Sequence, residues 1–128
     1  LSVENFTNQN VIDNSNHSNI NATNATVYNS SLVYVTMEQN SYTVNAGSSV
    51  KMKCTMTNVS PIDIVWIYYV PGTGTTKTIY FENNYLNGLK DKFLITLEFT
   101  NSTNLTTFLE IPFVEYNDSF YTYQCECN

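Results

Sequence analysis

Apolar and polar residues alternate with period two along much of the chain, and this pattern decides the class of fold. Residues 50–57 show it without a fault, because four apolar side chains fall on one face: Val50, Met52, Cys54 and Met56. No window carries the 3.6-residue apolar stripe of an amphipathic helix. The sequence therefore predicts an all-β domain.

Short β-rich runs separated by turn residues predict about eight strands. The breaks between them include Asn45-Ala46-Gly47, Ser60-Pro61 and Pro71-Gly72. We expect strands at residues 32–37, 42–44, 50–57, 64–70, 77–82, 93–99, 105–111 and 120–127.

The 128 residues suffice for one domain, and the chain divides into two regions. Residues 1–31 are polar, with isolated apolar residues that follow neither the strand nor the helix period. Such a segment buries too little surface to offset its ordering entropy. We expect residues 1–31 to form an Asn/Ser/Thr-rich leader or stalk, with at most a short stretch docked on the domain at residues 32–128.

The acceptor pattern for N-glycosylation, N-x-S/T, occurs nine times, where composition alone predicts about four. The candidate glycosylation sites are Asn5, Asn16, Asn21, Asn24, Asn29, Asn58, Asn101, Asn104 and Asn117. A genome that favours Asn codons would also raise the count, but lysine is scarce here. The pattern favours an extracellular glycoprotein, secreted or held at the cell surface.

Acidic residues outnumber basic ones 11 to 5, and arginine is absent. Because nucleic acids and anionic membranes are bound through Lys and Arg, this balance argues against both as partners. Aromatic residues reach 14% of the chain, and charged residues only 12%.

The residues needed for catalysis are missing from the sequence. We find no nucleophile elbow and no phosphate-binding glycine loop, and His17 stands alone as a nitrogen ligand. Four acidic residues lie near one another in sequence and are read as solvated rather than as a calcium site: Glu110, Glu115, Asp118 and Glu126. We expect no enzymatic activity, no cofactor, no metal and no small-molecule substrate.

Three cysteines fit one disulfide in an oxidising compartment, with one cysteine left over. Trp66 follows Cys54 by 12 residues, Cys125 follows Trp66 by 59, and Tyr123 lies two residues before Cys125. This spacing resembles the immunoglobulin superfamily, in its variable (V-set) type. The resemblance implies an immunoglobulin-like β-sandwich with a Cys54–Cys125 disulfide and a core signature of Trp66 and Tyr123. It also suggests an ion pair between Lys92 and Asp118.

In such domains a strand G follows the strand that holds Cys125, but only three residues remain here. We expect strand G to be missing or supplied elsewhere, by the leader or by another chain. An open edge would favour dimerisation. Cys127 would bond to a cysteine in a missing segment, bridge to a second chain, or stay a buried thiol.

The resemblance also implies a binding face on the sheet that contains Trp66. Its outward residues are expected to be Val65, Ile67, Tyr69, Tyr80 (with Ile79 or Phe81 as alternates) and Gln124. No acceptor pattern falls between Asn58 and Asn101, so this face would be free of glycans.

An apolar, glycan-free face predicts a domain that binds a cell-surface protein, in adhesion or immune modulation. The dense acceptor patterns are similar in style to immunoglobulin-like immune-evasion proteins encoded by large DNA viruses. Two alternatives remain: a host adhesion domain of the CD2/SLAM type, and a glycan-shielded structural spacer of a larger surface glycoprotein.

Overall fold

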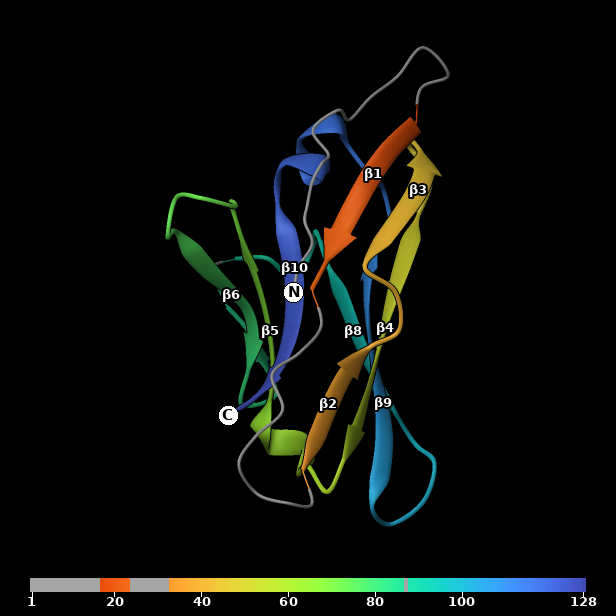
Figure 1. Ribbon diagram of the computed structural model, residues 1–128, viewed down its shortest axis with the longest axis vertical. Helices are drawn as coiled ribbons and strands as arrows, with labels where there is room; N and C mark the ends of the chain where they lie inside the picture. The colour runs from red at the N-terminus through yellow and green to blue at the C-terminus, as the bar shows by residue number, and fades with distance from the viewer. Residues whose placement is uncertain (1–16, 24–32, 87) are drawn as a thin grey trace.

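The protein is a β-sandwich of two packed sheets with an immunoglobulin-like arrangement (Figure 1). The computed structural model describes residues 17–23, 33–86 and 88–128. Its elements are strands and two short 3-10 helices, η2 (Pro61–Asp63) and η3 (Tyr116–Phe120). The predicted all-β sandwich is therefore confirmed.

Eight strands of the described residues correspond to the eight expected ones. They are β2 (Tyr34–Met37), β3 (Ser41–Asn45), β4 (Val50–Thr57), β5 (Ile64–Tyr69), β6 (Thr76–Phe81), β8 (Leu94–Phe99), β9 (Asn104–Ile111) and β10 (Thr122–Cys127). Two more were not predicted: β1 (His17–Ala22) and β7 (Asn84–Tyr85).

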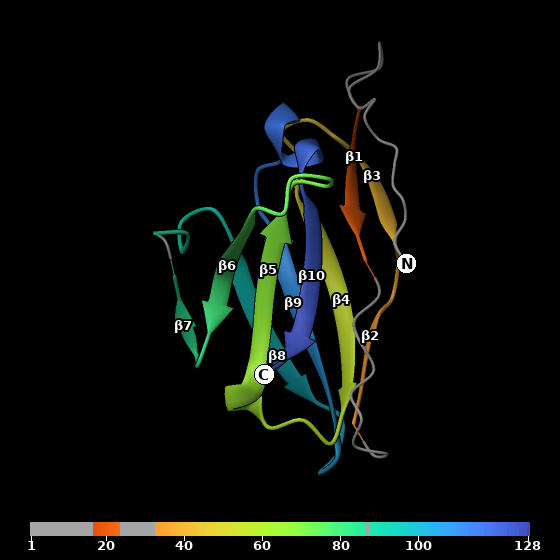
Figure 2. The same cartoon turned by 60° about the vertical axis from the view of Figure 1, so that its left-hand side comes forward.

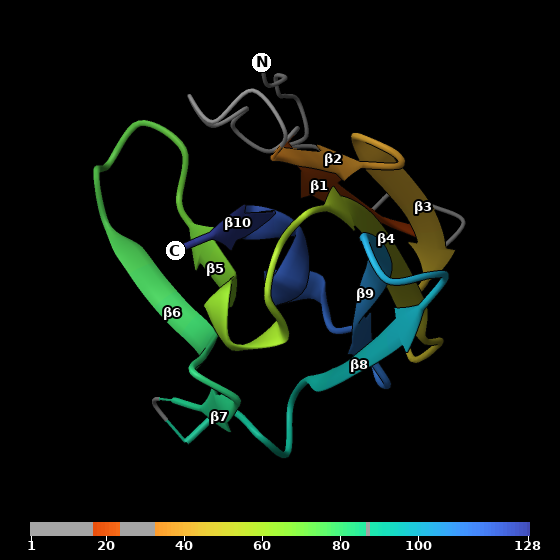
Figure 3. The same ribbon diagram turned by 90° about the horizontal axis from the view of Figure 1, so that it is seen from below.

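The described strands form two layers, which Figure 3 shows end-on. The four-stranded sheet has the order β2-β4-β9-β8, and the six-stranded sheet has the order β3-β1-β10-β5-β6-β7. Strand β4 alternates buried and more exposed residues along its whole length, as its sequence predicts. The inward residues of both sheets form one core, whose largest fully buried side chains include Trp66, Tyr123, Met52 and Leu109. Burying each of these contributes about 1.5–3 kcal/mol.

Strand β1 lies between β3 and β10 in the six-stranded sheet, so that it covers the edge of β10 (Figure 2). It pairs antiparallel with β3 through five residue pairs and parallel with β10 through two, Asn21 with Thr122 and Ala22 with Tyr123. The strand expected to be missing beside β10 is thus supplied from the segment predicted to be a leader. Residues 17–23 of that segment are described, and residues 1–16 and 24–31 lie outside the described residues. The domain boundary at residue 32 stays a prediction.

Candidate functional site

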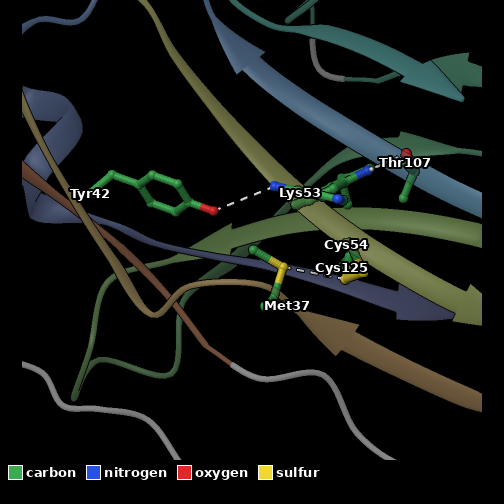
Figure 4. Close-up of a disulfide and its surroundings, with 7 residues drawn as sticks. Met37, Tyr42, Lys53, Cys54, Thr107 and Cys125 are labelled. Carbon is green, nitrogen blue, oxygen red and sulfur yellow. Dashed lines mark hydrogen bonds between the residues drawn. A yellow bond between two sulfur atoms is a disulfide. The ribbon is translucent and has the colours of Figure 1, made fainter.

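A disulfide between Cys54 on β4 and Cys125 on β10 joins the two sheets at the centre of the core (Figure 4). Both cysteines are fully buried, and the thioether sulfur of Met37 lies 3.4 Å from Sγ of Cys125. Beside the bridge, Trp66 is fully buried, and its Nε1 donates a hydrogen bond to Oγ1 of Thr107 on β9 at 3.1 Å. These contacts fix the position of β5 and β10, whose outward residues form the candidate site.

Tyr123 ties η3 to the start of β10. Its ring is fully buried, and its hydroxyl donates to the backbone oxygen of Asp118 at 3.1 Å. Burial, with the Asp118 charge nearby, raises the pKa of Tyr123 well above its usual value. The phenol therefore stays protonated and keeps this hydrogen bond at physiological pH.

Lys92 pairs with Asp118, as the resemblance suggested, and also with Glu115. The distances from Lys92 Nζ are 2.9 Å to Asp118 Oδ2 and 3.2 Å to Glu115 Oε1. Burial lowers the pKa of Lys92, but the hydrogen bonds and charges of the two carboxylates outweigh this and raise it. Asp118 Oδ2 also accepts a hydrogen bond from the Glu115 amide at 2.7 Å. The cluster holds the turn before β10 in place, and we read its role as structural.

The outer face of the six-stranded sheet carries a hollow of about 680 Å³, which we call the outer hollow. Its apolar lining comes from three elements: Val65 and Ile67 on β5, Phe81 on β6, and Leu86 after β7. The polar and C-terminal part of its lining consists of Thr76, Thr78, Glu126, Cys127 and Asn128. The outer hollow is the candidate recognition site.

Two of the five residues predicted for the binding face line the outer hollow, and the other three lie elsewhere on the six-stranded sheet. Val65 and Ile67 line the outer hollow. Gln124 is half-buried and pairs in register with Ile67. Tyr69 is half-buried and lines a smaller hollow of about 230 Å³ with Tyr121 among others.

Tyr80 lies elsewhere than the prediction placed it. It is 8% exposed, belongs to the core, and packs edge-on against Tyr85 at 5.4 Å between ring centroids. Its neighbour Phe81, one of the two alternates, lines the outer hollow instead. The cause is an irregularity in the pairing of β5 with β6: Trp66 pairs with Tyr80 but Ile67 pairs with Thr78. The skipped residue shifts the alternation, so Ile79 and Tyr80 are both buried.

Glu126 and Cys127 lie at the C-terminal end of β10, where they line the outer hollow. Burial raises the pKa of the half-buried Glu126 carboxyl. Burial and the negative charge of Asp63 raise the pKa of the Cys127 thiol. A raised pKa makes the thiol a weak nucleophile, and its Sγ lies 3.7 Å from the backbone oxygen of Asn128. Which cysteine, if any, bonds to Cys127 stays a prediction.

A second exposed apolar surface, which the sequence did not predict, is formed by two aromatic residues of η3, and we call it the aromatic surface. Tyr116 and Phe120 are 48% and 46% exposed, and their rings pack edge-on with 5.0 Å between the ring centroids. The signal available in the sequence was the density of aromatic residues around Asn117. Since these residues follow no strand period, the sequence did not place them on one surface.

The candidate glycosylation sites differ in accessibility. Asn58, Asn101 and Asn117 are exposed, and Asn104 is half-buried. Asn21, in β1, is only 9% exposed. Asn5, Asn16, Asn24 and Asn29 lie outside the described residues. None of the described sites lines the outer hollow.

Within the described ranges, no group of three or more His, Cys, Asp or Glu side chains is arranged to hold a metal ion. The same part of the chain contains no helix that is long and apolar enough to span a membrane. No protein-family model matches the sequence, and no curated protein matches it either.

Proposed function

We propose that this protein is a non-enzymatic extracellular recognition domain of the variable immunoglobulin type that binds a cell-surface protein through its outer hollow. The observation that carries the proposal is the apolar lining by Val65, Ile67, Phe81 and Leu86 on a sheet face. Large apolar side chains gathered in one depression favour protein contact, because a partner recovers the free energy of removing them from water.

The composition of the outer hollow fits a protein partner better than a small charged ligand. Glu126 is the one Asp or Glu residue among those that line it, and its raised pKa reflects partial removal from water. Two threonines in its lining, Thr76 and Thr78, add the polar groups that usually accompany the apolar centre of an interface. The volume of about 680 Å³ would accommodate a few side chains of a partner.

The accessible candidate glycosylation sites favour the outer hollow over the aromatic surface near η3. A glycan is bulky and hydrophilic, and it keeps partners away from the surface around it. Asn117 lies within η3 between Tyr116 and Phe120, whereas Asn58 and Asn101 follow β4 and β8. None of the acceptor sites in the described part of the chain lies on β5 or β6.

The variable type is supported by the strands beyond β5. Strands β6 and β7 extend the six-stranded sheet at the position where variable domains carry two additional strands. The Cys54–Cys125 disulfide supports an oxidising, extracellular compartment. A virus-encoded immune-modulating glycoprotein and a host CD2/SLAM-type adhesion domain both fit this description.

The test is a binding screen of the secreted protein against an array of leukocyte surface ectodomains, with two single variants. Ile67→Glu places a charge in the outer hollow, and Phe99→Glu places one on the far sheet, where Phe99 is 65% exposed. We expect a partner that the Ile67 variant loses and the Phe99 variant keeps. Thermal unfolding of both variants checks that each still folds.

Other outcomes separate the alternatives. Binding that survives Ile67→Glu and is lost in Phe120→Glu would move the site to the aromatic surface. Silence across the array would favour the spacer module. Mass before and after glycosidase treatment tests the compartment, and an unchanged mass in protein from a secretory host would contradict it.

A further inference from the structure

Asn21 occupies an interior position in the six-stranded sheet although it belongs to an N-glycosylation acceptor pattern. On one side it pairs in register with Ser41 of β3, and on the other with Thr122 of β10. The asparagine is 9% exposed. By contrast, Asn58, Asn101 and Asn117 are exposed.

The residues around Asn21 are committed to the sandwich. Ile20 and Ala22 are 0% and 1% exposed and belong to the core. The amide of Ala22 donates to the Asn40 oxygen at 2.9 Å, and the amide of Thr23 donates to the Tyr123 oxygen at 3.1 Å. Docking of β1 therefore encloses the acceptor residue between two neighbouring strands.

Thr23, whose hydroxyl completes the acceptor pattern, is buried as well. It is 6% exposed, and its Oγ1 is the one buried side-chain polar atom of the described residues without a hydrogen-bond partner. Leaving a buried hydroxyl unpaired costs about 1–3 kcal/mol. This cost reduces the net free energy that docking of the end of β1 contributes to the fold.

We propose that glycosylation of Asn21 and docking of β1 exclude each other, so that occupancy of this site decides whether the edge of β10 is covered. The inference rests on the proposed extracellular function, because the modification needs a secretory pathway. In the transfer step, a lipid-linked oligosaccharyl diphosphate loses its glycosyl–phosphate bond. Nδ2 of Asn21 forms the new bond to the sugar carbon, and the amide proton leaves with the lipid diphosphate.

The two states would differ in what they expose. With Asn21 unmodified, β1 covers β10 and β3 and delivers Ile20 to the core. With a glycan at Asn21, the strand cannot return to a position that is 9% exposed, because the sugar would have to displace packed neighbours. The edges of β3 and β10 then present unpaired backbone groups that can accept a strand from another chain.

Hydrogen exchange read by mass spectrometry tests this directly, because β1 peptides with and without the glycan differ in mass within one sample. Protein from a secretory host is exchanged, digested and analysed, and the glycosylated Asn101 and Asn117 peptides serve as controls. We expect the amides of Ala22 and Thr23 to exchange at least about tenfold faster in the glycosylated β1 peptide. A sample in which Asn21 is unmodified beside modified Asn101 and Asn117 also supports the proposal.

Equal protection from hydrogen exchange in the glycosylated and unglycosylated β1 peptides would overturn the proposal that glycosylation and docking exclude each other. A matched pair of variants in unglycosylated protein gives an independent reading: Asn21→Lys and Asn101→Lys each add a long charged side chain. Loss of protection at Ala22 and Thr23 in the Asn21 variant alone supports the exclusion, and unchanged protection contradicts it. If Asn101 and Asn117 carry no glycan, the proposed function fails. The two lysine variants would still show whether a bulky group at Asn21 is compatible with docking of β1.

Discussion

The indole Nε1 of Trp66 on β5 donates a hydrogen bond to Oγ1 of Thr107 on β9 at 3.1 Å, linking the two sheets through side chains. Both residues are fully buried, so water cannot replace either partner. Trp66 also lies next to Cys125 in the register between β5 and β10. The Cys54–Cys125 disulfide and the Trp66–Thr107 hydrogen bond therefore join the two sheets within one small region of the core.

Replacing Thr107 by valine should destabilise the fold by about 1–3 kcal/mol, because the buried indole N–H loses its acceptor while the side-chain volume is kept. Urea unfolding measures the difference. Thr55→Val, at an exposed position of β4, is the matched control and should change stability by less than about 0.5 kcal/mol. Equal effects in the two variants would contradict the role of the hydrogen bond.

Removing the disulfide with the double variant Cys54→Ala/Cys125→Ala should cost about 4 kcal/mol, since the bridge spans 71 residues and restricts the unfolded chain. Equilibrium unfolding at fixed protein concentration gives the value. The control is Cys127→Ala, which leaves the bridge in place. A loss below about 1 kcal/mol in the double variant would show that core packing alone holds the sheets together.

Asp118→Ala should destabilise the domain by about 1–3 kcal/mol, because the Asp118 carboxylate is 6% exposed and accepts bonds from Lys92 and from the Glu115 amide. Glu115 is the more exposed of the two partners of Lys92, since the Glu115 side chain is 62% exposed. Glu115→Ala should therefore lower the stability of the domain by less than about 1 kcal/mol. Thermal unfolding compares the two. Similar losses would mean that burial does not decide the strength of this cluster.

We expect the free energy of unfolding to depend on pH through the half-buried carboxyl of Glu126. Because burial raises its folded-state pKa above the unfolded value, the folded state binds the proton more tightly. The stabilisation from this tighter proton binding is fully present below the pKa of Glu126 in the unfolded chain. It is lost as the pH rises through the pKa of Glu126 in the folded state. Glu126→Gln should therefore become more stable relative to wild type between pH 4 and neutral pH, by less than about 1 kcal/mol for a half-buried group.

Unfolding curves at several pH values check this prediction. Glu98→Gln, at an exposed position of β8, controls for the loss of one negative charge. A stability difference that does not grow with pH would contradict the assignment of the effect to burial.

Much of the fold follows from local patterns. The alternation in residues 50–57 places Met52 and Cys54 inward, as observed, because side chains of a strand alternate in direction whatever its partners are. The spacing of Cys54, Trp66 and Cys125 indicated the sandwich, since this spacing resembles a known arrangement. The placement of Val65 and Ile67 on the outer face follows from the same alternation.

The position of Tyr80 could not be predicted from its own strand. A single skipped residue in the pairing of β5 with β6 exchanges the faces of everything beyond it, and such an irregularity depends on the partner strand. Strand β7 was missed for a related reason. It forms after a two-residue turn in which Glu82 and Asn83 both have positive φ, and the sequence offers Asn83 alone as a signal for it.

The sequence by itself determined the class of fold, the inward residues of regular strands such as β4 and the apolar character of the outer face, because these depend on the period of each strand. Only the tertiary structure decided that β1 lies beside β10 and encloses Asn21. Only Ile20 and Ala22 alternate with polar residues in β1, which is too short a pattern to predict a strand, and the place of β1 depends on backbone hydrogen bonds to strands distant in sequence. Backbone hydrogen bonds depend little on side-chain type, so the sequence of β1 does not indicate which strands it pairs with.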